Sequence, residues 1–134
     1  MRAYQGDLTN VDDANPPGIS TPEFYDFDVA AVGLGFHHLH DPQLAAKRIV
    51  SRLRMGGVLV IIDFLTHAPV PGLADIVKHH GFSEDTVRSM FEKAGAGGDF
   101  KLEVMGKGMV FQHRDDEGKQ WQRDVFMARG TRVS

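Results

Sequence analysis

The sequence of 134 residues is long enough for one domain, and its 42% of hydrophobic residues can form a sizeable core. The formal net charge of −3 disfavours binding to nucleic acid, which depends largely on basic patches. The sequence has no cysteine, which excludes disulfides and thiolate catalysis, and no apolar run long enough to cross a membrane.

The first 22 residues are predicted to form an arm and a loop. A short arm, residues 3–8, precedes a segment from Asn10 to Pro22 that is rich in Pro, Gly, Asn and Asp. Turn-forming residues at this density are typical of a loop. We therefore expect a single domain over residues 1–134, with an N-terminal arm and loop over residues 1–22.

A strand, a helix and a second strand are predicted next. Residues 27–34 form an unbroken apolar run, typical of a strand covered on both faces in a parallel sheet. Asp41 and Pro42 predict the start of a helix, and the glycine pair at 56–57 predicts its end. Residues 58–64 are rich in β-branched side chains, which favours a central strand. This order is a βαβ unit, whose crossover is right-handed.

The C-terminal part is predicted to form a helix and a hairpin. Ser83 is a helix cap, and the helix that follows has a buried stripe made of Val87, Met90, Phe91 and Ala94. A shorter helix is expected over residues 73–79. Residues 101–113 and 120–129 are predicted as two antiparallel strands around a polar turn. The fold class is therefore α/β, with a mostly parallel, Rossmann-like sheet and an antiparallel C-terminal hairpin strand.

The loop after the first strand is a candidate binding loop. Gly33-Leu34-Gly35 matches the start of the dinucleotide pattern G-x-G-x-x-G. His38 stands where the third glycine is needed, and the helix begins only at Asp41, too late to direct its N-terminus at a pyrophosphate. These departures disfavour a nicotinamide or flavin cofactor.

Three histidines follow this loop, at positions 37, 38 and 40. Adjacent side chains of an extended chain point to opposite faces, so His37 and His38 cannot both bind one ion. A zinc site would need ligands from elsewhere, such as His67, His79 or His80, and we predict no metal. His37 or His38 is the best candidate for a general base, because imidazole exchanges protons near neutral pH. Asp63, which ends the second strand, either contacts a ligand or caps the next loop.

Several segments together resemble one family. Residues 25–32 followed by Phe36-His37-His38-Leu39, the run Leu53-Arg54-Met55-Gly56-Gly57 leading into residues 58–63, and Gln5-Gly6-Asp7-Leu8 resemble class I S-adenosylmethionine-dependent methyltransferases. The resemblance assigns these segments to the fourth strand, the turn into the fifth strand and the end of the third strand. Residues 81–95 and the hairpin then resemble the next helix and the sixth and seventh strands. The family's glycine-rich cofactor loop and the acidic residue that binds the ribose have no counterpart in this sequence.

The resemblance implies a cofactor, S-adenosylmethionine, and methyl transfer to a small molecule. It implies that Asp7 accepts a hydrogen bond from the adenine amino group and that the backbone N–H of Leu8 lies beside it. Gly33 and Leu34 would line the cofactor, and His37 or His38 would face the substrate as a base.

The resemblance also predicts an open sheet edge. In the family the strand order is 3-2-1-4-5-7-6, so the fourth strand is interior, whereas the first two strands have no counterpart here. The edge formed by Val29 to Leu34 must then be covered, because exposed apolar edges associate. The arm formed by residues 3–8, a second copy of the chain or a different partner chain are the alternatives, and our hypothesis is a homodimer.

Two other functions stay open on the sequence. One alternative is a non-catalytic dimerisation or regulatory module that binds an intact methyltransferase through this edge. Alternatively, it is a small-molecule binder that uses the cleft at the carboxyl end of the sheet without the sulfonium cofactor. In each case no signal sequence is visible at the N-terminus, and we expect a cytoplasmic protein.

Overall fold

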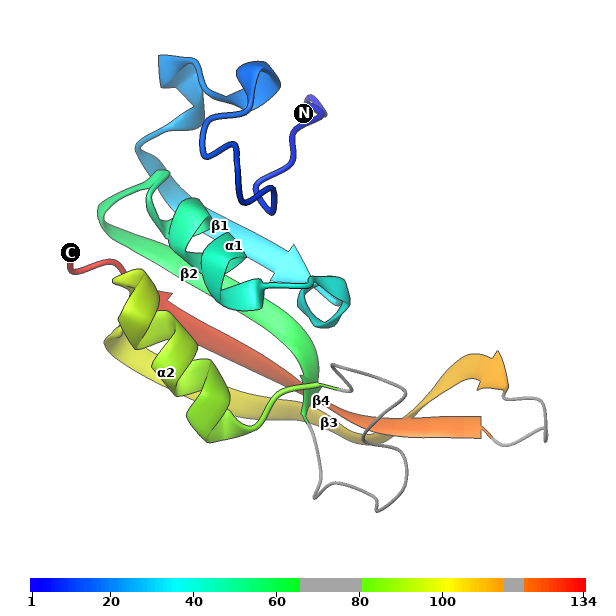
Figure 1. Cartoon of the computed structure of the whole chain (residues 1–134). Coiled ribbons are helices and arrows are strands. Elements are labelled where there is room, and N and C mark those ends of the chain that lie inside the picture. Colours follow the sequence, from blue (N-terminus) through cyan, green and yellow to red (C-terminus); the bar gives the residue numbers. More distant parts are fainter. Residues whose placement is uncertain (66–80, 115–119) are drawn as a thin grey trace.

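The computed structural model describes residues 1–65, 81–114 and 120–134. The expected helix at 73–79, most of the polar turn, and His67, His79 and His80 lie outside these residues. The main elements are β1 (Phe27–Gly33), α1 (Pro42–Val50), β2 (Leu53–Leu65), α2 (Glu84–Ala94), β3 (Gly98–Arg114) and β4 (Gln120–Thr131). The four strands form one sheet in the order β1-β2-β4-β3 (Figure 1).

The sheet is mixed, so the expectation of a mostly parallel sheet is wrong. β1 and β2 are parallel, whereas β4 is antiparallel both to β2 and to β3. A parallel pairing requires a crossover, and α1 supplies the one crossover of this kind in the described sheet. The remaining pairings come from the C-terminal hairpin, which is antiparallel as predicted.

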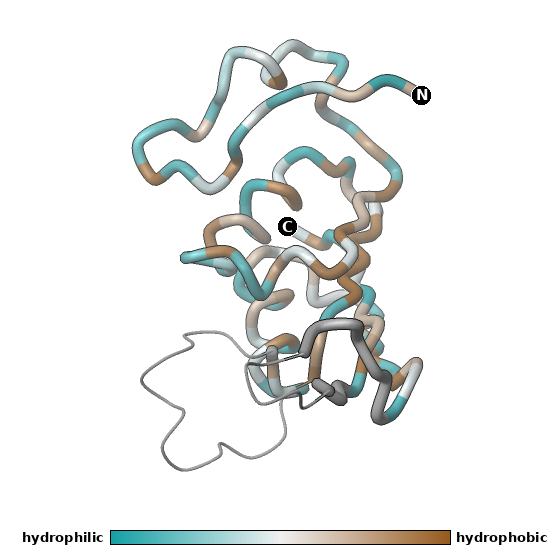
Figure 2. Tube along the Cα trace, turned by 90° about the vertical axis from the view of Figure 1, so that its right-hand side faces the viewer, coloured by the Kyte–Doolittle hydropathy of each residue, from teal (hydrophilic) through white to brown (hydrophobic). Residues whose placement is uncertain are grey.

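β1 is a strand as predicted, but it is not covered on both faces. Ala30 and Val32 pack against the core, whereas Val29 is 58% exposed and Phe27 is 42% exposed. The reason is the arrangement of the layers: α1 and α2 lie on the same face of the sheet (Figures 1 and 2). β1 also forms one edge of the sheet, so its outer flank has no neighbouring strand in the described chain.

The first helix starts as predicted and ends earlier. Asp41 caps α1 by accepting a hydrogen bond from the backbone N–H of Leu44 at 3.0 Å, and Pro42 occupies the first turn. The helix ends at Val50, so the expectation that the glycine pair at 56–57 ends it is wrong. Both glycines lie within β2, and Gly56 has a φ of +80°. The register of β1 on β2 shifts at this point, and the left-handed glycine accommodates the extra residues of β2.

The second helix matches its prediction. Ser83 caps α2 by accepting the backbone N–H of Thr86 at 3.2 Å, and Gly95, with a φ of +89°, ends the helix. The buried residues of α2 are the predicted Val87, Met90, Phe91 and Ala94. Of the helices in the described part of the chain, none is long and apolar enough to cross a membrane.

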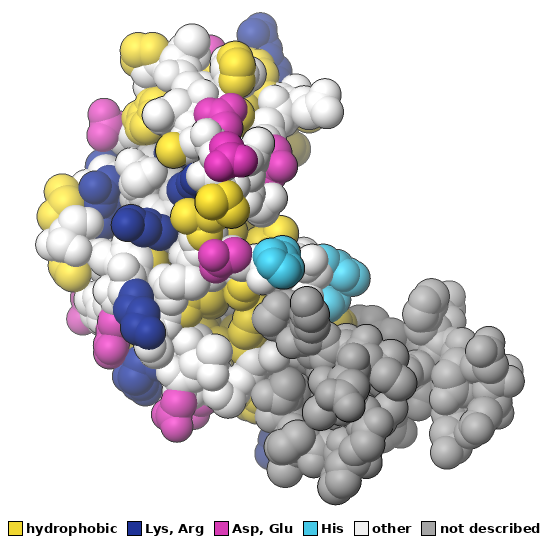
Figure 3. All heavy atoms as spheres, in the orientation of Figure 1, with side chains coloured by type: hydrophobic (Ala, Val, Ile, Leu, Met, Phe, Trp, Pro, Cys, Tyr) yellow, Lys and Arg dark blue, Asp and Glu magenta, His cyan; other side chains and the backbone are white. Residues whose placement is uncertain are grey.

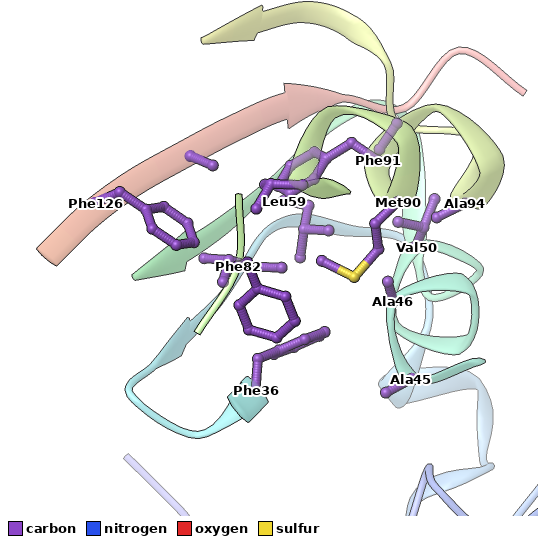
Figure 4. Packing of buried hydrophobic residues seen from close by; sticks show 14 of the residues in the cluster. Phe36, Ala45, Ala46, Val50, Leu59, Phe82, Met90, Phe91, Ala94 and Phe126 are labelled. Atoms are coloured by element: carbon purple, nitrogen blue, oxygen red, sulfur yellow. The ribbon is translucent and has the colours of Figure 1, made fainter. Parts of the chain in front are cut away.

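The core lies between the two helices and the sheet (Figure 4). Alternate residues of β2, Leu59 and Ile61, are fully buried there, together with Phe91 from α2 and Phe126 from β4. Near the carboxyl end of β1, the side chains of Phe36 and Phe82 lie close together in the same cluster. The core therefore anchors the segment that follows β1, where the candidate residues lie.

The N-terminal arm does not replace the missing strand, so that alternative is wrong. Residues 1–26 contain no strand, and their short 3₁₀ helices are Pro17–Ile19 and Pro22–Phe24. The guanidinium group of Arg48, on α1, donates hydrogen bonds to the backbone carbonyls of Leu8, Asn10, Val11 and Asp13. Carbonyl groups bound in this way are not available for pairing with a strand, which explains why this segment lies against α1.

Candidate functional site

The carboxyl ends of the two parallel strands lie side by side. Gly33 is paired with Ile62, and the backbone N–H of Leu34 donates to the carbonyl of Ile62 at 2.7 Å. Leu34 has a φ of +56°, a left-handed conformation that turns the chain sharply after β1. Ligands of open α/β folds bind beyond this end of the sheet.

A short helix places the two histidines at this end. The 3₁₀ helix η3 (Phe36–His38) follows the turn at Leu34. Its first residue, Phe36, is fully buried in the core, so the helix is fixed to the end of the sheet. His37 and His38 are therefore held just beyond the carboxyl ends of β1 and β2. Histidine side chains gather at the surface on this side of the molecule (Figure 3).

His37 is paired with the carboxylate of Asp63. Its ring atom Nδ1 lies 2.8 Å from Oδ1 of Asp63, and its backbone N–H donates to Oδ2 at 3.0 Å. The backbone N–H of Phe64 also donates to Oδ1, at 2.7 Å. The side chain of Asp63 is completely buried, whereas that of His37 is 15% exposed. A buried carboxylate requires such partners, and the two backbone N–H groups and the ring atom Nδ1 supply them.

Two further rings surround His37. The ring of His38 lies with its centroid 4.0 Å from that of His37, and the ring of Phe64 lies at 4.9 Å. His38 itself is exposed. The sequence predicted both histidines as candidates but left the role of Asp63 undecided. The structure shows that Asp63 accepts backbone N–H groups, as a cap does, and also contacts a candidate base.

Gly33 and Leu34 lie at the same end of the sheet as the histidines. A Cβ atom placed on Gly33 would meet no protein atom within 4 Å, so the space beside this residue is open. The side chain of Leu34 is 40% exposed. The structure thus brings together four predicted site residues: Gly33, Leu34, His37 and His38.

The other two predicted site residues make their contacts elsewhere. The carboxylate of Asp7 accepts hydrogen bonds from the hydroxyl group of Thr9 at 2.5 Å and from its backbone N–H at 2.8 Å. These two bonds, the side-chain one first, lower the pKa of Asp7, and the charge of Arg48 contributes in the same direction. The carbonyl of Leu8 accepts from Arg48, near the C-terminal end of α1. Asp7 and Leu8 are therefore held by Thr9 and Arg48.

The expectation that His37 and His38 point to opposite faces is wrong, because both lie on a 3₁₀ helix with their ring centroids 4.0 Å apart. Within the described residues, no group of three or more His, Cys, Asp or Glu side chains is arranged to hold a metal ion. The pair formed by His37 and Asp63 uses Nδ1 and both carboxylate oxygens for the hydrogen bonds described above. The arrangement orients the imidazole ring of His37, and an oriented imidazole is suited to transferring a proton.

Comparisons with known proteins identify the fold. No family model matches the sequence, and no curated protein matches it either. Among solved structures, a Thermotoga maritima S-adenosylmethionine-dependent methyltransferase, described as a possible histamine N-methyltransferase, matches with a TM-score of 0.54 and 18% identity. The chain has a class I methyltransferase fold. The predicted correspondence of β1, β2, β4 and β3 to the fourth, fifth, seventh and sixth strands of this fold agrees with the observed strand order.

Two more structures with similar folds extend the comparison. Phosphoethanolamine N-methyltransferase 2 from Haemonchus contortus, solved with S-adenosyl-L-methionine, matches with a TM-score of 0.57 and 10% identity. The YcgJ protein from Bacillus subtilis matches with a TM-score of 0.58 and 13% identity. The matches cover 81% of this chain for the Thermotoga and Haemonchus structures and 86% for YcgJ. They cover 57%, 34% and 68% of those three proteins, so this chain spans only part of their length.

Proposed function

We propose that the chain is the substrate-facing part of an S-adenosylmethionine-dependent methyltransferase that acts on a small molecule. The observation that carries this proposal is the position of His37 and His38 beside Gly33 and Leu34, at the carboxyl end of the parallel strands. This is the end of the sheet at which α/β folds bind their ligands.

The residues of this site fit one side of the cofactor. Gly33 borders open space, and the exposed side chain of Leu34 adds an apolar surface next to it. The sequence has no counterpart of the family's glycine-rich loop, so the opposite side of the cofactor requires residues from another segment or chain. When bound, S-adenosylmethionine supplies a methyl group that is activated by its positively charged sulfur.

The chain's own residues would then bind and deprotonate the methyl acceptor. His37 or His38 takes the proton that the acceptor oxygen or nitrogen loses as that atom forms its new bond to carbon. The remaining contribution is positioning, because a displacement at carbon requires the acceptor to be in line and close. The apolar ring of Phe64 lies next to His37, with the ring centroids 4.9 Å apart.

Calorimetry with S-adenosylhomocysteine tests the proposal. The substitution Gly33→Val tests whether the ligand binds at the proposed site. A Cβ atom at Gly33 would meet no protein atom within 4 Å, so we expect the side chain of Gly33→Val to extend into the space assigned to the cofactor. We expect the unchanged chain to bind S-adenosylhomocysteine at least tenfold more tightly than Gly33→Val does. The matched control is Ala31→Val, two residues earlier on the same strand, which is expected to bind like the unchanged chain. Equal binding by all three proteins would contradict the proposed site.

A second function, a homodimerisation module, is favoured by the exposed flank of β1. Because the N–H of Leu34 points to β2, the alternation of a strand directs the N–H and C=O groups of Val29, Ala31 and Gly33 away from β2. We infer that a second copy of the chain pairs with this edge across a two-fold axis, which would extend the sheet from one protomer into the other.

Sedimentation at micromolar concentration distinguishes the two functions. A stable dimer that gives no heat with S-adenosylhomocysteine supports the dimerisation module. A monomer that binds S-adenosylhomocysteine supports the enzyme and contradicts the dimer. A monomer without binding contradicts the homodimer and the cofactor site of the chain alone, and it leaves a different partner chain as the source of the missing residues.

A further inference from the structure

We propose that Asp63 is a positioning residue that holds His37 in one tautomer, with the proton on Nδ1 and the lone pair on Nε2. The inference deepens the proposed function, because it selects His37 rather than His38 as the base and adds a residue whose role the sequence left undecided. This tautomer is expected in the protein even when no ligand is bound.

The chemistry of the carboxylate fixes the position of the proton. An ionised carboxylate offers only acceptor atoms, and Nδ1 of His37 lies 2.8 Å from Oδ1 of Asp63. A bare Nδ1 at this distance would place two lone pairs against each other, whereas Nδ1–H forms a charge-assisted hydrogen bond. A neutral imidazole carries one proton, so Nε2 on the other side of the ring is then the basic atom.

The carboxylate is itself held in place. Its Oδ1 accepts the backbone N–H of Phe64, the next residue of β2, and its Oδ2 accepts the backbone N–H of His37. β2 is an interior strand, between β1 and β4, which makes it a rigid support. One carboxylate therefore binds both the backbone and the ring of His37, and this fixes the ring relative to the end of the sheet.

Burial makes this hydrogen bond effective. The side chain of Asp63 has no exposed surface, so water does not compete for its oxygens. The side chain of His37 keeps 15% of its surface exposed, which allows contact with a ligand at its free edge. His38 is exposed, and water is available to its ring nitrogens. The structure thus gives His37 the more defined proton position of the two histidines.

Long-range ¹⁵N–¹H correlation spectra of the labelled, ligand-free chain test the proposal at a mildly alkaline pH. We expect His37 to show a protonated Nδ1 and an unprotonated Nε2. The exposed His40 serves as the internal reference and is expected to show the mixture of tautomers of free imidazole. A wild-type His37 with the proton on Nε2 overturns the proposal, and this measurement requires no variant.

Asp63→Asn adds a second test of the same contact. Asparagine offers one acceptor oxygen to the three donors that face Asp63, so we expect His37 to lose its single tautomer and to show a mixture. Asp41→Asn is the matched control, because it changes a carboxylate that also accepts a backbone N–H, at the start of α1. A folded Asp63→Asn chain with an unchanged His37 tautomer overturns the proposal. Failure to bind S-adenosylhomocysteine would count against the proposed function alone, since these spectra need no ligand.

Discussion

At the scale of single residues, the turn around Asp7 determines what this carboxylate is able to bind. The hydroxyl group of Thr9 and its backbone N–H both donate to the Oδ1 atom of Asp7. A role in binding adenine requires the same carboxylate to accept a further donor. Changing this turn therefore shows how strongly Thr9 already binds the carboxylate of Asp7.

Thr9→Val removes the side-chain hydrogen bond, which is the largest cause of the lowered pKa of Asp7. We expect the pKa of Asp7 to rise towards its ordinary value of 3.8. A carboxyl with a lowered pKa in the folded state stabilises the fold above its unfolded pKa and loses that contribution as the pH falls through its folded pKa. The contribution of Asp7 is thus lost below about pH 3.8, and it is smaller in the variant.

A titration of the carboxyl carbons by NMR measures the change directly. Thr21→Val is the control, because the hydroxyl group of Thr21 donates to Glu23 instead and its loss leaves Asp7 unaltered. If the pKa of Asp7 were the same in Thr9→Val and in the unchanged chain, the assignment of the shift to Thr9 would be wrong.

Single residues also show where prediction from sequence reaches its limit. His37 and His38 were predicted as candidates because imidazole exchanges protons near neutral pH and because the family resemblance places them facing the substrate. The partner of His37, Asp63, lies 26 residues away, and their contact depends on the parallel pairing of β1 and β2. The type and position of Asp63 suggested a role, but only the register of the two strands specifies which one.

At the scale of elements, local signals were sufficient for α2 and insufficient for α1. The cap at Ser83 and the buried stripe both act within a few residues, and each has the predicted role. The end of α1 depends on how β2 pairs with β1, because Gly56 serves a shift in register inside β2 rather than a helix terminus. Local signals also do not reveal that α1 and α2 lie on the same face of the sheet, which leaves the other face uncovered by helices in the described part of the chain (Figures 1 and 2).

Gly95→Ala tests the C-terminal end of α2. Gly95 has a φ of +89°, and an added Cβ would lie 2.8 Å from Oγ and 2.9 Å from the carbonyl oxygen of Ser134. Strain and this close approach together are expected to lower the free energy of unfolding by about 1–3 kcal/mol. Urea denaturation measures the change. Gly35→Ala is the control, since its Cβ meets Val32 at an ordinary 3.6 Å, and an equal loss in both variants would contradict the explanation.

At the scale of the whole molecule, the outer flank of β1 combines two kinds of unsatisfied surface. The strand forms an edge of the sheet, with backbone groups directed away from β2, and Phe27 and Val29 expose apolar side chains beside that edge. The sequence allowed the open edge to be predicted, because the first two strands of the family fold have no counterpart in it. No local pattern in the sequence identifies what would cover this edge.

Val29→Lys tests whether a second copy covers this flank. Val29 is 58% exposed and makes no contribution to the buried core, so the substitution is expected to change stability by less than about 0.5 kcal/mol. In a dimer built on β1, however, two lysines would face each other near the two-fold axis, and charged residues on an edge strand oppose pairing. We expect the unchanged chain to sediment as a dimer at micromolar concentration and Val29→Lys to sediment as a monomer.

Val11→Lys places the same charge on a residue that is 72% exposed in the N-terminal loop, and it is expected to leave the dimer intact. A dimer that persists in Val29→Lys would show that the chains associate through another surface and would contradict the proposed pairing of β1 with its copy.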